Sequence, residues 1–315
     1  MLVSICIATF KRQEYLANLL DKISTQNISK DIEVNVAVVD NDSSGSGREV
    51  VEKFLLNNPG YKIVYEIELQ RGIPFTRNRA VSLVSKNTDF VVFIDDDEYP
   101  EENWLTGLLK TQKLKDADVV SGPAFPIFIN KPASWIHKGK YFVRPHYSKL
   151  QTGDSLYYLY MATNNVLIKY SRLMSLEGPF DENLGLSGSD DSDLAYRLNE
   201  MGCKMYWTNE AVVWEWIPDQ RANLTWILQR AYRFANSNWF LSPNKNMVTR
   251  LKIIIGGLGR IAVGAILFFP SLLCSLIGRF DYCVTVMRII VRGVGMIAGA
   301  IGYSYEEYKH FYTHQ

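Results

Sequence analysis

The chain has 315 residues, of which 47% are hydrophobic and 21% are charged. This balance excludes a disordered tail protein, a collagen-like fibre and a small disulfide scaffold, because it provides enough apolar surface for a large core. The net charge of +1 is unevenly distributed: segment 244–303 has seven lysines and arginines against one aspartate, a net charge of +6. A mildly acidic body is thus joined to a basic, apolar end. That asymmetry favours a membrane surface over nucleic acid as a partner.

Short apolar runs alternate with segments of helical periodicity through the first 121 residues. This alternation predicts an α/β fold, with a parallel sheet and helices on both of its faces. Beyond residue 123 the pattern weakens, until two further helices are predicted at 190–201 and 224–240. The predicted strands are 2–8, 34–39, 62–66, 90–94 and 118–121, and the predicted helices between them are 14–24, 48–56, 74–85 and 101–113.

Two apolar segments, 261–278 and 284–302, end the chain. The first has 18 residues without a charge, which is near the lower limit for a membrane span. The second contains Arg288 and Arg292 one turn apart, which a helix in the membrane interface would direct toward lipid headgroups. We therefore expect helices that lie in the membrane plane or re-enter it. Two full spans and a pair of buried core helices are the alternatives.

The first predicted strand is not preceded by a basic and apolar leader, and the four cysteines form no C-x-x-C pair. Both features predict reduced thiols and a main body that stays in the cytosol. Together with the basic apolar end, they predict a location at the cytoplasmic face of the inner membrane.

Two acidic clusters follow predicted strands. Asp95-Asp96-Asp97 follows the fourth strand, and Asp40-Asn41-Asp42 follows the second. Because ligands bind beyond the carboxyl ends of parallel strands, both clusters should lie on one rim of the sheet. Adjacent carboxylates repel one another, and Mg²⁺ or Mn²⁺ with a phosphate-bearing ligand would offset that repulsion. The alternatives are a solvated acidic turn and, at Asp40, an Asx turn that closes the strand.

A third acidic cluster, Asp190-Asp191-Ser192-Asp193, opens a predicted helix. The helix dipole stabilises negative charge in the first turn, so these acids are also consistent with ordinary helix chemistry. In the functional interpretation, an ionised carboxylate here removes the proton of an acceptor hydroxyl as a general base. Arg71 and Arg77 lie around a loop that leads into a helix, where they could contact phosphates or base carbonyls or lie on the surface.

Several of these motifs occur in a fixed order. They are, along the chain, Thr9, VVDND, GIPFTRNRAV, FIDDDEYP, TNNVLI and SDDSDLAYRLNEMG. In this order they resemble glycosyltransferase family 2, which has the GT-A fold, and within it bacterial glucosyltransferases of the succinoglycan exopolysaccharide type. The resemblance implies a GT-A domain over 1–243, with a nucleotide-sugar half (1–122) and an acceptor half (123–243). Membrane-associating helices (244–303) and a tail (304–315) would follow.

The resemblance also implies roles for the matching residues. Asp191 would be the catalytic base, with Asp190 in place of the usual glutamate beside it. Asp95 and Asp97 would hold Mn²⁺ or Mg²⁺ with the donor's diphosphate, and Asp97 would be the more direct ligand. Glu215 stands where many relatives have a histidine.

Other residues would bind the donor or acceptor. Asp40 would bind the uracil, with Thr9 and Arg77 close to it. Asn164 and Asn165 would lie near the sugar, and Arg221 near the diphosphate. The remaining substrate-binding residues implied by the two acidic motifs are Asp42 and Asp96.

The implied reaction is an inverting transfer of a hexose, with glucose expected, from a UDP-sugar to a hydroxyl of a lipid-linked saccharide. It would belong to bacterial surface or exopolysaccharide synthesis. One alternative is a metal-dependent nucleotidyltransferase, which would require a basic, glycine-rich loop after the first strand, yet residues 9–12 contain no glycine. The other is a non-catalytic, membrane-bound protein that binds nucleotide sugars or acts as a scaffold.

Overall fold

The computed structural model describes residues 1–184, 188–242 and 244–305. It divides into two units, residues 1–126 with 144–216 and residues 127–143 with 217–315. The sequence-based boundary at 243 differs from this division, because the helix over 224–240 packs with the two C-terminal helices. The predicted tail, 304–315, lies outside the described residues from 306 onward.

The first unit is built on a seven-stranded sheet of order β3-β2-β1-β4-β8-β6-β9. The first four strands are parallel, but β8 runs antiparallel to β4 and β6. The five predicted strands therefore run in the same direction, and the antiparallel β8 was not predicted, because its five residues, four of them buried, carry no periodic signal within a loop-rich region. These strands are β1 (Leu2–Thr9), β2 (Glu33–Asp40), β3 (Lys62–Ile67), β4 (Phe90–Ile94), β6 (Val119–Ser121), β8 (Asn165–Lys169) and β9 (Met205–Trp207).

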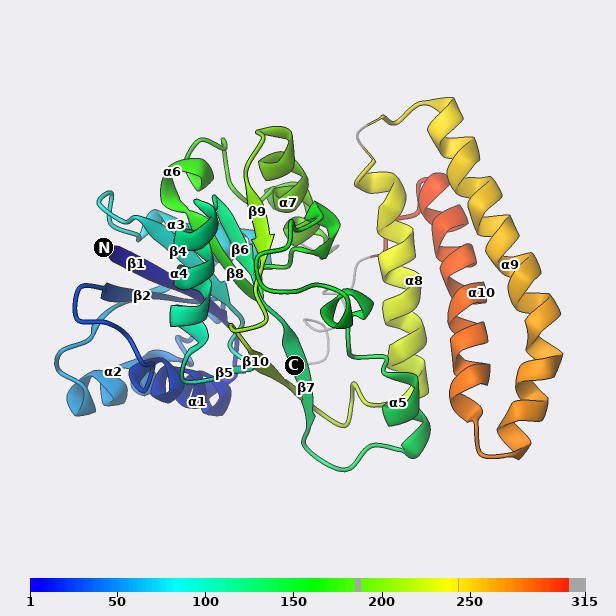
Figure 1. The fold of residues 1–315 in the computed structure, drawn as a ribbon, viewed down its shortest axis with the longest axis horizontal. Helices are drawn as coiled ribbons and strands as arrows, with labels where there is room; N and C mark the ends of the chain where they lie inside the picture. The colour runs from blue at the N-terminus through cyan, green and yellow to red at the C-terminus, as the bar shows by residue number, and fades with distance from the viewer. Residues whose placement is uncertain (185–187, 243, 306–315) are drawn as a thin grey trace. The chain divides into compact units, whose positions relative to one another are not determined.

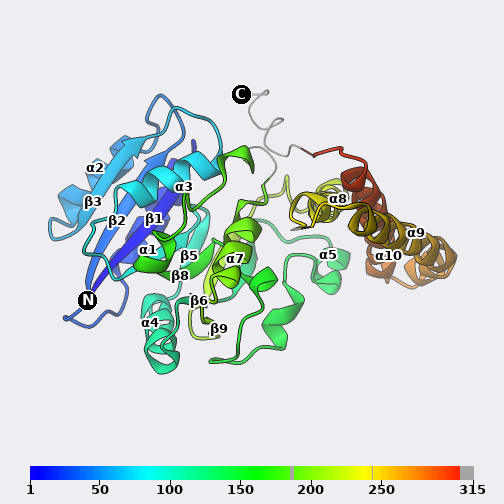
Figure 2. The ribbon, with the colours of Figure 1, turned by 90° about the horizontal axis from the view of Figure 1, so that it is seen from above.

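Helices cover both faces of this sheet, as predicted (Figures 1 and 2). Along β1, Val3, Ile5 and Ile7 pack against α1, α2 and α4, while Cys6 points to the core beneath α3 and α7. This alternation follows from the two-residue period of a strand. The helices of this unit are α1 (Gln13–Ser24), α2 (Arg48–Asn57), α3 (Ile73–Ser82), α4 (Trp104–Lys115), α6 (Tyr170–Leu173) and α7 (Asp190–Glu200), with 3-10 turns η1 (Pro145–Ser148), η2 (Tyr158–Tyr160) and η3 (Glu182–Leu184).

A smaller sheet has the order β5-β10-β7. Its strands are β5 (Glu98–Pro100), β7 (Ala124–Phe128) and β10 (Val213–Ile217). The antiparallel pairing of β5 with β10 places Glu215 opposite Glu98. Two acids far apart in the sequence are thereby brought together just after the Asp95–Asp97 turn.

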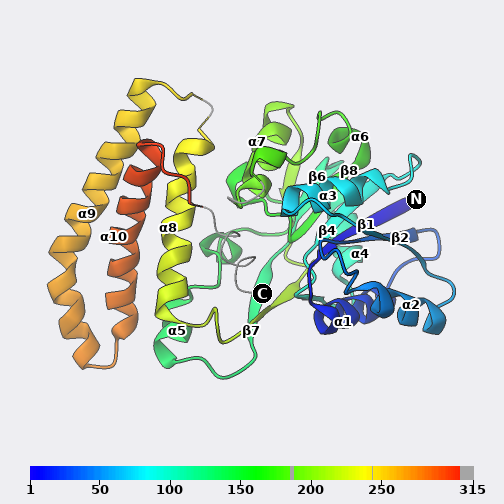
Figure 3. The same cartoon turned by 180° about the vertical axis from the view of Figure 1, so that it is seen from behind.

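The second unit contains α8 (Leu224–Phe240), α9 (Met247–Leu276), α10 (Phe280–Ala300) and the short α5 (Ser134–Gly139). The three long helices lie side by side in Figures 1 and 3. Glycines set their spacing: a Cβ added at Gly257 would lie 2.8 Å from the carbonyl oxygen of Gly293, and one at Gly299 would overlap the carbonyl oxygen of Asn236. By length and composition, α9 and α10 could each cross a membrane.

Candidate active site

The carboxyl ends of β1, β2 and β4 meet at one edge of the large sheet, as predicted. Thr9 at the end of β1 is in register with Asp40 at the end of β2. On its other side, Thr9 Oγ1 donates a hydrogen bond of 2.8 Å to Asp96 Oδ2. The two acidic motifs therefore lie on the same rim, bridged by the end of β1.

Arg12 neutralises part of this rim. Its Nη1 atom donates to Asp96 Oδ1 at 2.8 Å and to Asp97 Oδ2 at 3.0 Å. Although burial alone would lower the pKa of the guanidinium, the charges of Asp96 and Asp97 raise it. Burial also raises the pKa of Asp96, against the opposing effect of Arg12. Arg12 is a site residue that sequence reasoning missed, since nothing in its immediate sequence indicates which distant acids it pairs with.

Arg77 connects the same rim to the start of α7. Its Nη2 donates to Asp95 Oδ1 at 2.9 Å, and its Nη1 donates to Asp190 Oδ2 at 2.7 Å. The guanidinium also lies 5.6 Å from the ring centre of Phe180. Burial raises the pKa of Asp190, and the positive charge of Arg77 opposes that rise. The predicted contact of Arg77 with a nucleotide base stays a prediction; in the structure its partners are two carboxylates.

Asp191 differs from Asp190 in its surroundings. Asp190 is buried against Arg77, whereas Asp191 is partly exposed in the first turn of α7. The Oδ1 atom of Asp191 accepts a hydrogen bond of 2.8 Å from the Ser192 N–H. Its Oδ2 accepts none from the described residues. Of the two adjacent carboxylates, Asp191 is thus the one suited to general-base chemistry.

Side chains from two helices hold the segment that leads to α7. Asn78 Nδ2 donates to the carbonyl oxygen of Phe180 at 2.9 Å, and Asn78 Oδ1 accepts from the Phe180 N–H at 3.0 Å. Arg197 donates to the carbonyl oxygens of Gly178 and Pro179, and also to Asp193. The segment is therefore held by Asn78, about a hundred positions earlier in the sequence, and by Arg197, about twenty positions later.

Glu98 adds a further carboxylate to the rim. It is 2% exposed, and it accepts hydrogen bonds from the Asp95 N–H at 3.1 Å and from Asn164 Nδ2 at 2.7 Å. Its pKa lies well above the ordinary value, first because of burial and then because Asp95 and Glu215 are close. Neither of these two hydrogen bonds comes from a charged donor, so neither opposes the rise in the pKa of Glu98 by placing a positive charge beside it.

The donor set fits a divalent cation that is shared with a ligand. Carboxylate oxygens from Asp95 and Asp97 are ligands that Mg²⁺ and Mn²⁺ accept while phosphate oxygens complete the shell. Within residues 1–184, 188–242 and 244–305, no group of three or more His, Cys, Asp or Glu side chains is arranged to hold an ion by itself.

The acidic residues at the end of β2, Asp40 and Asp42, mainly stabilise the turn that follows the strand. The Asp40 carboxylate is fully buried and accepts hydrogen bonds from the N–H groups of Asp42 and Gly47 and from Tyr65 Oη. Asp42 in turn accepts from Ser44 Oγ at 2.5 Å, which lowers the pKa of Asp42. These bonds form the Asx-type turn that was one interpretation of the sequence, and base binding by Asp40 stays a prediction.

Two other predicted site residues have different positions. Asn165 is 1% exposed, and its amide is occupied by the carbonyl oxygens of Pro123 and Ala211 and by Trp104 Nε1. This geometry joins β8 to its surroundings and gives no support to a sugar contact. Arg221 belongs to the second unit, and its predicted contact with the diphosphate stays a prediction.

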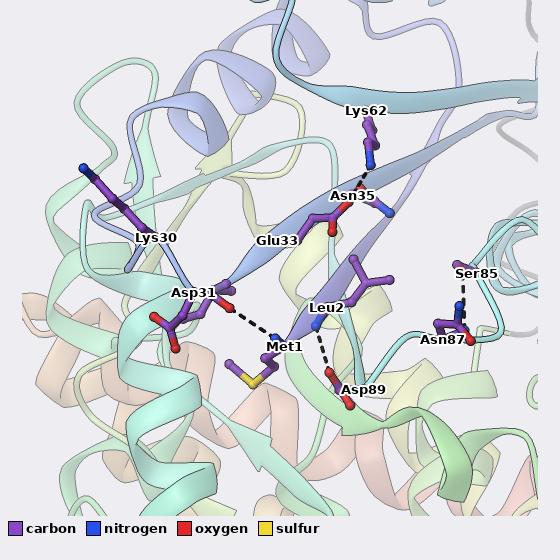
Figure 4. Close-up of a pocket in the computed structure, with 11 residues that line it drawn as sticks. Met1, Leu2, Lys30, Asp31, Glu33, Asn35, Lys62, Ser85, Asn87 and Asp89 are labelled. Carbon is purple, nitrogen blue, oxygen red and sulfur yellow. Dashed lines mark hydrogen bonds and ion pairs between the residues drawn. The ribbon is translucent and has the colours of Figure 1, made fainter.

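A separate pocket lies at the amino ends of the strands, opposite the acid-rich rim (Figure 4). It is lined by residues at the amino ends of β1 and β2, among them Leu2, Glu33 and Asn35. Leu2 N–H donates to Asp89 Oδ2 at 2.8 Å there, and Lys62 pairs with Glu33 at 2.6 Å. Since the acidic motifs follow the carboxyl ends of these strands, this pocket is distinct from the acid-rich rim.

Residues 4–170 match the family model described as glycosyl transferase family 2. Among curated proteins, the chain is similar to the succinoglycan biosynthesis protein ExoM of Rhizobium meliloti, with 29% identity over 95% of this chain and 93% of ExoM. It is also similar to the abequosyltransferase RfbV of Salmonella typhimurium, with 28% identity over 57% of this chain and 50% of RfbV.

Solved structures share the arrangement of the elements. TarS 1–349 of Staphylococcus aureus in complex with UDP has a TM-score of 0.54 and 17% identity, over 97% of this chain and 93% of that chain. The mannosyltransferase PcManGT of Pyrobaculum calidifontis, in complex with GDP-Man and Mn²⁺, has a TM-score of 0.61 and 17% identity, over 96% of this chain and 86% of that chain. At these identities the likeness concerns the fold.

Proposed function

Since the chain belongs to glycosyltransferase family 2 and has the GT-A fold, we propose that it transfers a hexose from a UDP-sugar to a hydroxyl of a saccharide acceptor, with inversion at the anomeric carbon. The observation that carries the proposal is the link made by Arg77. One guanidinium joins Asp95, on the rim proposed to hold the donor's diphosphate, to Asp190, which precedes the proposed base.

In the proposed reaction Asp191 removes the proton from the acceptor hydroxyl. The resulting oxygen attacks the anomeric carbon as the bond from that carbon to the diphosphate oxygen breaks on the opposite side, which inverts the configuration. The Oδ2 of Asp191 receives the proton, while its Oδ1 is held by the Ser192 N–H. Asp190 stays buried against Arg77 and fixes the start of α7, so that the neighbouring carboxylate keeps its orientation.

Asp95 and Asp97 would hold a Mn²⁺ or Mg²⁺ ion together with the donor. When bound, the ion neutralises negative charge that develops on the departing diphosphate. Arg12 and Arg77 orient the carboxylates of Asp97 and Asp95 and add positive charge beside them.

We further propose that the acceptor is a lipid-linked saccharide at the cytoplasmic face of the inner membrane. The basic, apolar segment 244–303 supports this location, since it combines exposed hydrophobic helices with a net charge of +6. Similarity to a succinoglycan biosynthesis protein over 95% of this chain supports polysaccharide synthesis as the setting.

Thermal stability of the purified protein with a panel of nucleotide sugars tests the donor site. We expect UDP-glucose or a related UDP-sugar to raise the melting temperature with Mn²⁺ present and to raise it much less with a chelator. Asp97→Ala should abolish the metal-dependent part of the shift. If no nucleotide sugar stabilised the protein, with or without metal, the transferase proposal would fail and a non-catalytic scaffold would be favoured.

A further inference from the structure

Three arginines lie together on one side of the α9–α10 pair. A Cβ added at Gly293 would lie 3.2 Å from the Cβ of Arg260, so Arg260 lies directly beside the backbone that follows Arg292. Arg288 is one turn before Arg292 on the same helix face. Burial lowers the pKa of both Arg288 and Arg292. The nearby charge of Arg292 lowers the pKa of Arg288 further, and that of Arg260 lowers the pKa of Arg292 further.

No carboxylate in the described part of the chain pairs with these three arginines. The acids of the second unit, up to residue 305, are Asp219 and Asp281, and both have other partners. Asp281 accepts two hydrogen bonds from Arg279, at 3.0 and 2.9 Å, and Asp219 accepts from Asn130 at 2.8 Å. A cluster of like charges without an opposite charge beside it attracts anions.

Two of the guanidinium groups make few hydrogen bonds to the described part of the protein. Arg288 Nε is buried and has no hydrogen-bond partner, and this guanidinium lies 4.9 Å from the ring centre of Tyr141. Arg260 donates only to the carbonyl oxygen of Gly256, at 3.2 Å, among the residues described. The planar fork of N–H donors on each group matches the oxygens of a phosphate.

The face of α9 opposite Arg260 is apolar. Along the outer side of α9 large hydrophobic side chains are 55–82% exposed, a proportion unusual for a helix of a soluble protein. They are Ile255, Leu258, Ile266, Phe269, Leu273 and Leu276. Arg260 and Arg292 lie near the middle of their helices, where a membrane-spanning arrangement would place them at costly depth. Helices lying in the interface would bury the apolar side chains and keep the arginines at headgroup level.

We propose that Arg260, Arg288 and Arg292 form a binding site for the phosphate groups of anionic phospholipids and thereby hold the second unit at the membrane surface. This inference deepens the proposed membrane location by naming the residues and the ligand chemistry, and it rests on that location. It requires no donor or acceptor sugar to be bound.

Co-sedimentation with vesicles tests the site. The full-length Asp191→Asn protein should bind phosphatidylcholine vesicles that contain phosphatidylglycerol and bind pure phosphatidylcholine vesicles much more weakly. Each basic residue at an anionic surface contributes about fivefold to binding, so Arg288→Gln with Arg292→Gln should weaken binding about 30-fold. Lys131→Gln with Lys245→Gln removes the same charge from exposed positions of the same unit and should change binding about twofold or less.

Equal binding to neutral and anionic vesicles would overturn the inference, as would equal losses in the arginine and lysine variants. Stabilisation by inorganic phosphate that depends on the arginines, without vesicle binding, would instead identify a site for free phosphate and overturn the lipid assignment. Because the vesicle assay uses a variant without the proposed base, failure of sugar transfer and failure of lipid binding are separate results. Circular dichroism of each variant checks that the helices remain folded.

Discussion

Arg77 Nη1 donates a hydrogen bond of 2.7 Å to Asp190 Oδ2, across 113 positions of the sequence. The arginine side chain is 10% exposed and the aspartate side chain 5%, so the pair is shielded from water. The same guanidinium also binds Asp95. A single buried cation therefore sets the position of the proposed base helix relative to the proposed diphosphate site.

Replacing Arg77 by methionine should destabilise the protein by about 3–5 kcal/mol, because a buried carboxylate loses its partner. Arg79→Met is the matched control on the same helix. Arg79 pairs with Glu66 at the surface, where its side chain is 46% exposed, so its loss should cost about 0–1 kcal/mol. Urea denaturation of both variants measures the difference, and equal stabilities would contradict the proposed importance of the Arg77 link.

Asp191→Asn should reduce sugar transfer by about 10²- to 10⁴-fold, because the amide cannot accept the proton of the acceptor hydroxyl. Nucleotide-sugar binding should be largely retained, which calorimetry with a UDP-sugar measures. Asp193→Asn is the control: Asp193 lies in the same helical turn, but its side chain pairs with Arg197 at 2.8 Å. Transfer that survived in the Asp191 variant would show that another group is the base.

His146 should make stability sensitive to mildly acidic pH. The ring is 5% exposed, and it stacks on Tyr160 with a centroid distance of 4.2 Å. Burial, assisted by the charge of Arg144, lowers the pKa of His146 to about 4. Between pH 6.5 and 4 the unfolded chain therefore binds a proton at this position that the folded chain does not, so stability decreases as the pH falls.

The loss attributable to His146 over that range should be about 3 kcal/mol. His146→Phe removes the titrating group and keeps an aromatic ring. Its stability at pH 7 should be close to that of the parent, while its decrease toward pH 4 should be smaller by about that amount. Urea denaturation at pH 7 and pH 4.5 compares the two proteins, and parallel decreases would show that His146 is not the cause.

Gly299→Ala should weaken the packing of α8 against α10, because the added Cβ would overlap the carbonyl oxygen of Asn236. Overpacking of this kind costs about 1–3 kcal/mol. Gly259→Ala is the opposite case: no atom lies within 4 Å of the added Cβ, so alanine should stabilise α9 by about 0.8–1 kcal/mol. Thermal unfolding in detergent should show shifts of opposite sign, and shifts of the same sign would contradict this packing.

The sequence alone predicted most of the elements around the site. Each of the five predicted strands and the helices between them is present, because alternating or 3.6-residue periodicity depends only on near neighbours. The common rim was also predictable: once β1, β2 and β4 are parallel, Asp40 and Asp95 must follow strands that end at the same edge. The family's motifs located the proposed base, Asp191, at the start of a helix.

Only the tertiary structure decided how distant residues pair. The sequence does not indicate which acid of the rim pairs with Arg12, and the fold brings it to Asp96 and Asp97. Asn165 lies in a motif that resembles a sugar-binding sequence, yet with β8 inserted between two strands its amide nitrogen donates to main-chain carbonyl oxygens and its amide oxygen accepts from Trp104. Periodicity is a local property, whereas hydrogen bonds and ion pairs between residues about a hundred positions apart form only when the chain packs. Local sequence patterns therefore do not predict them.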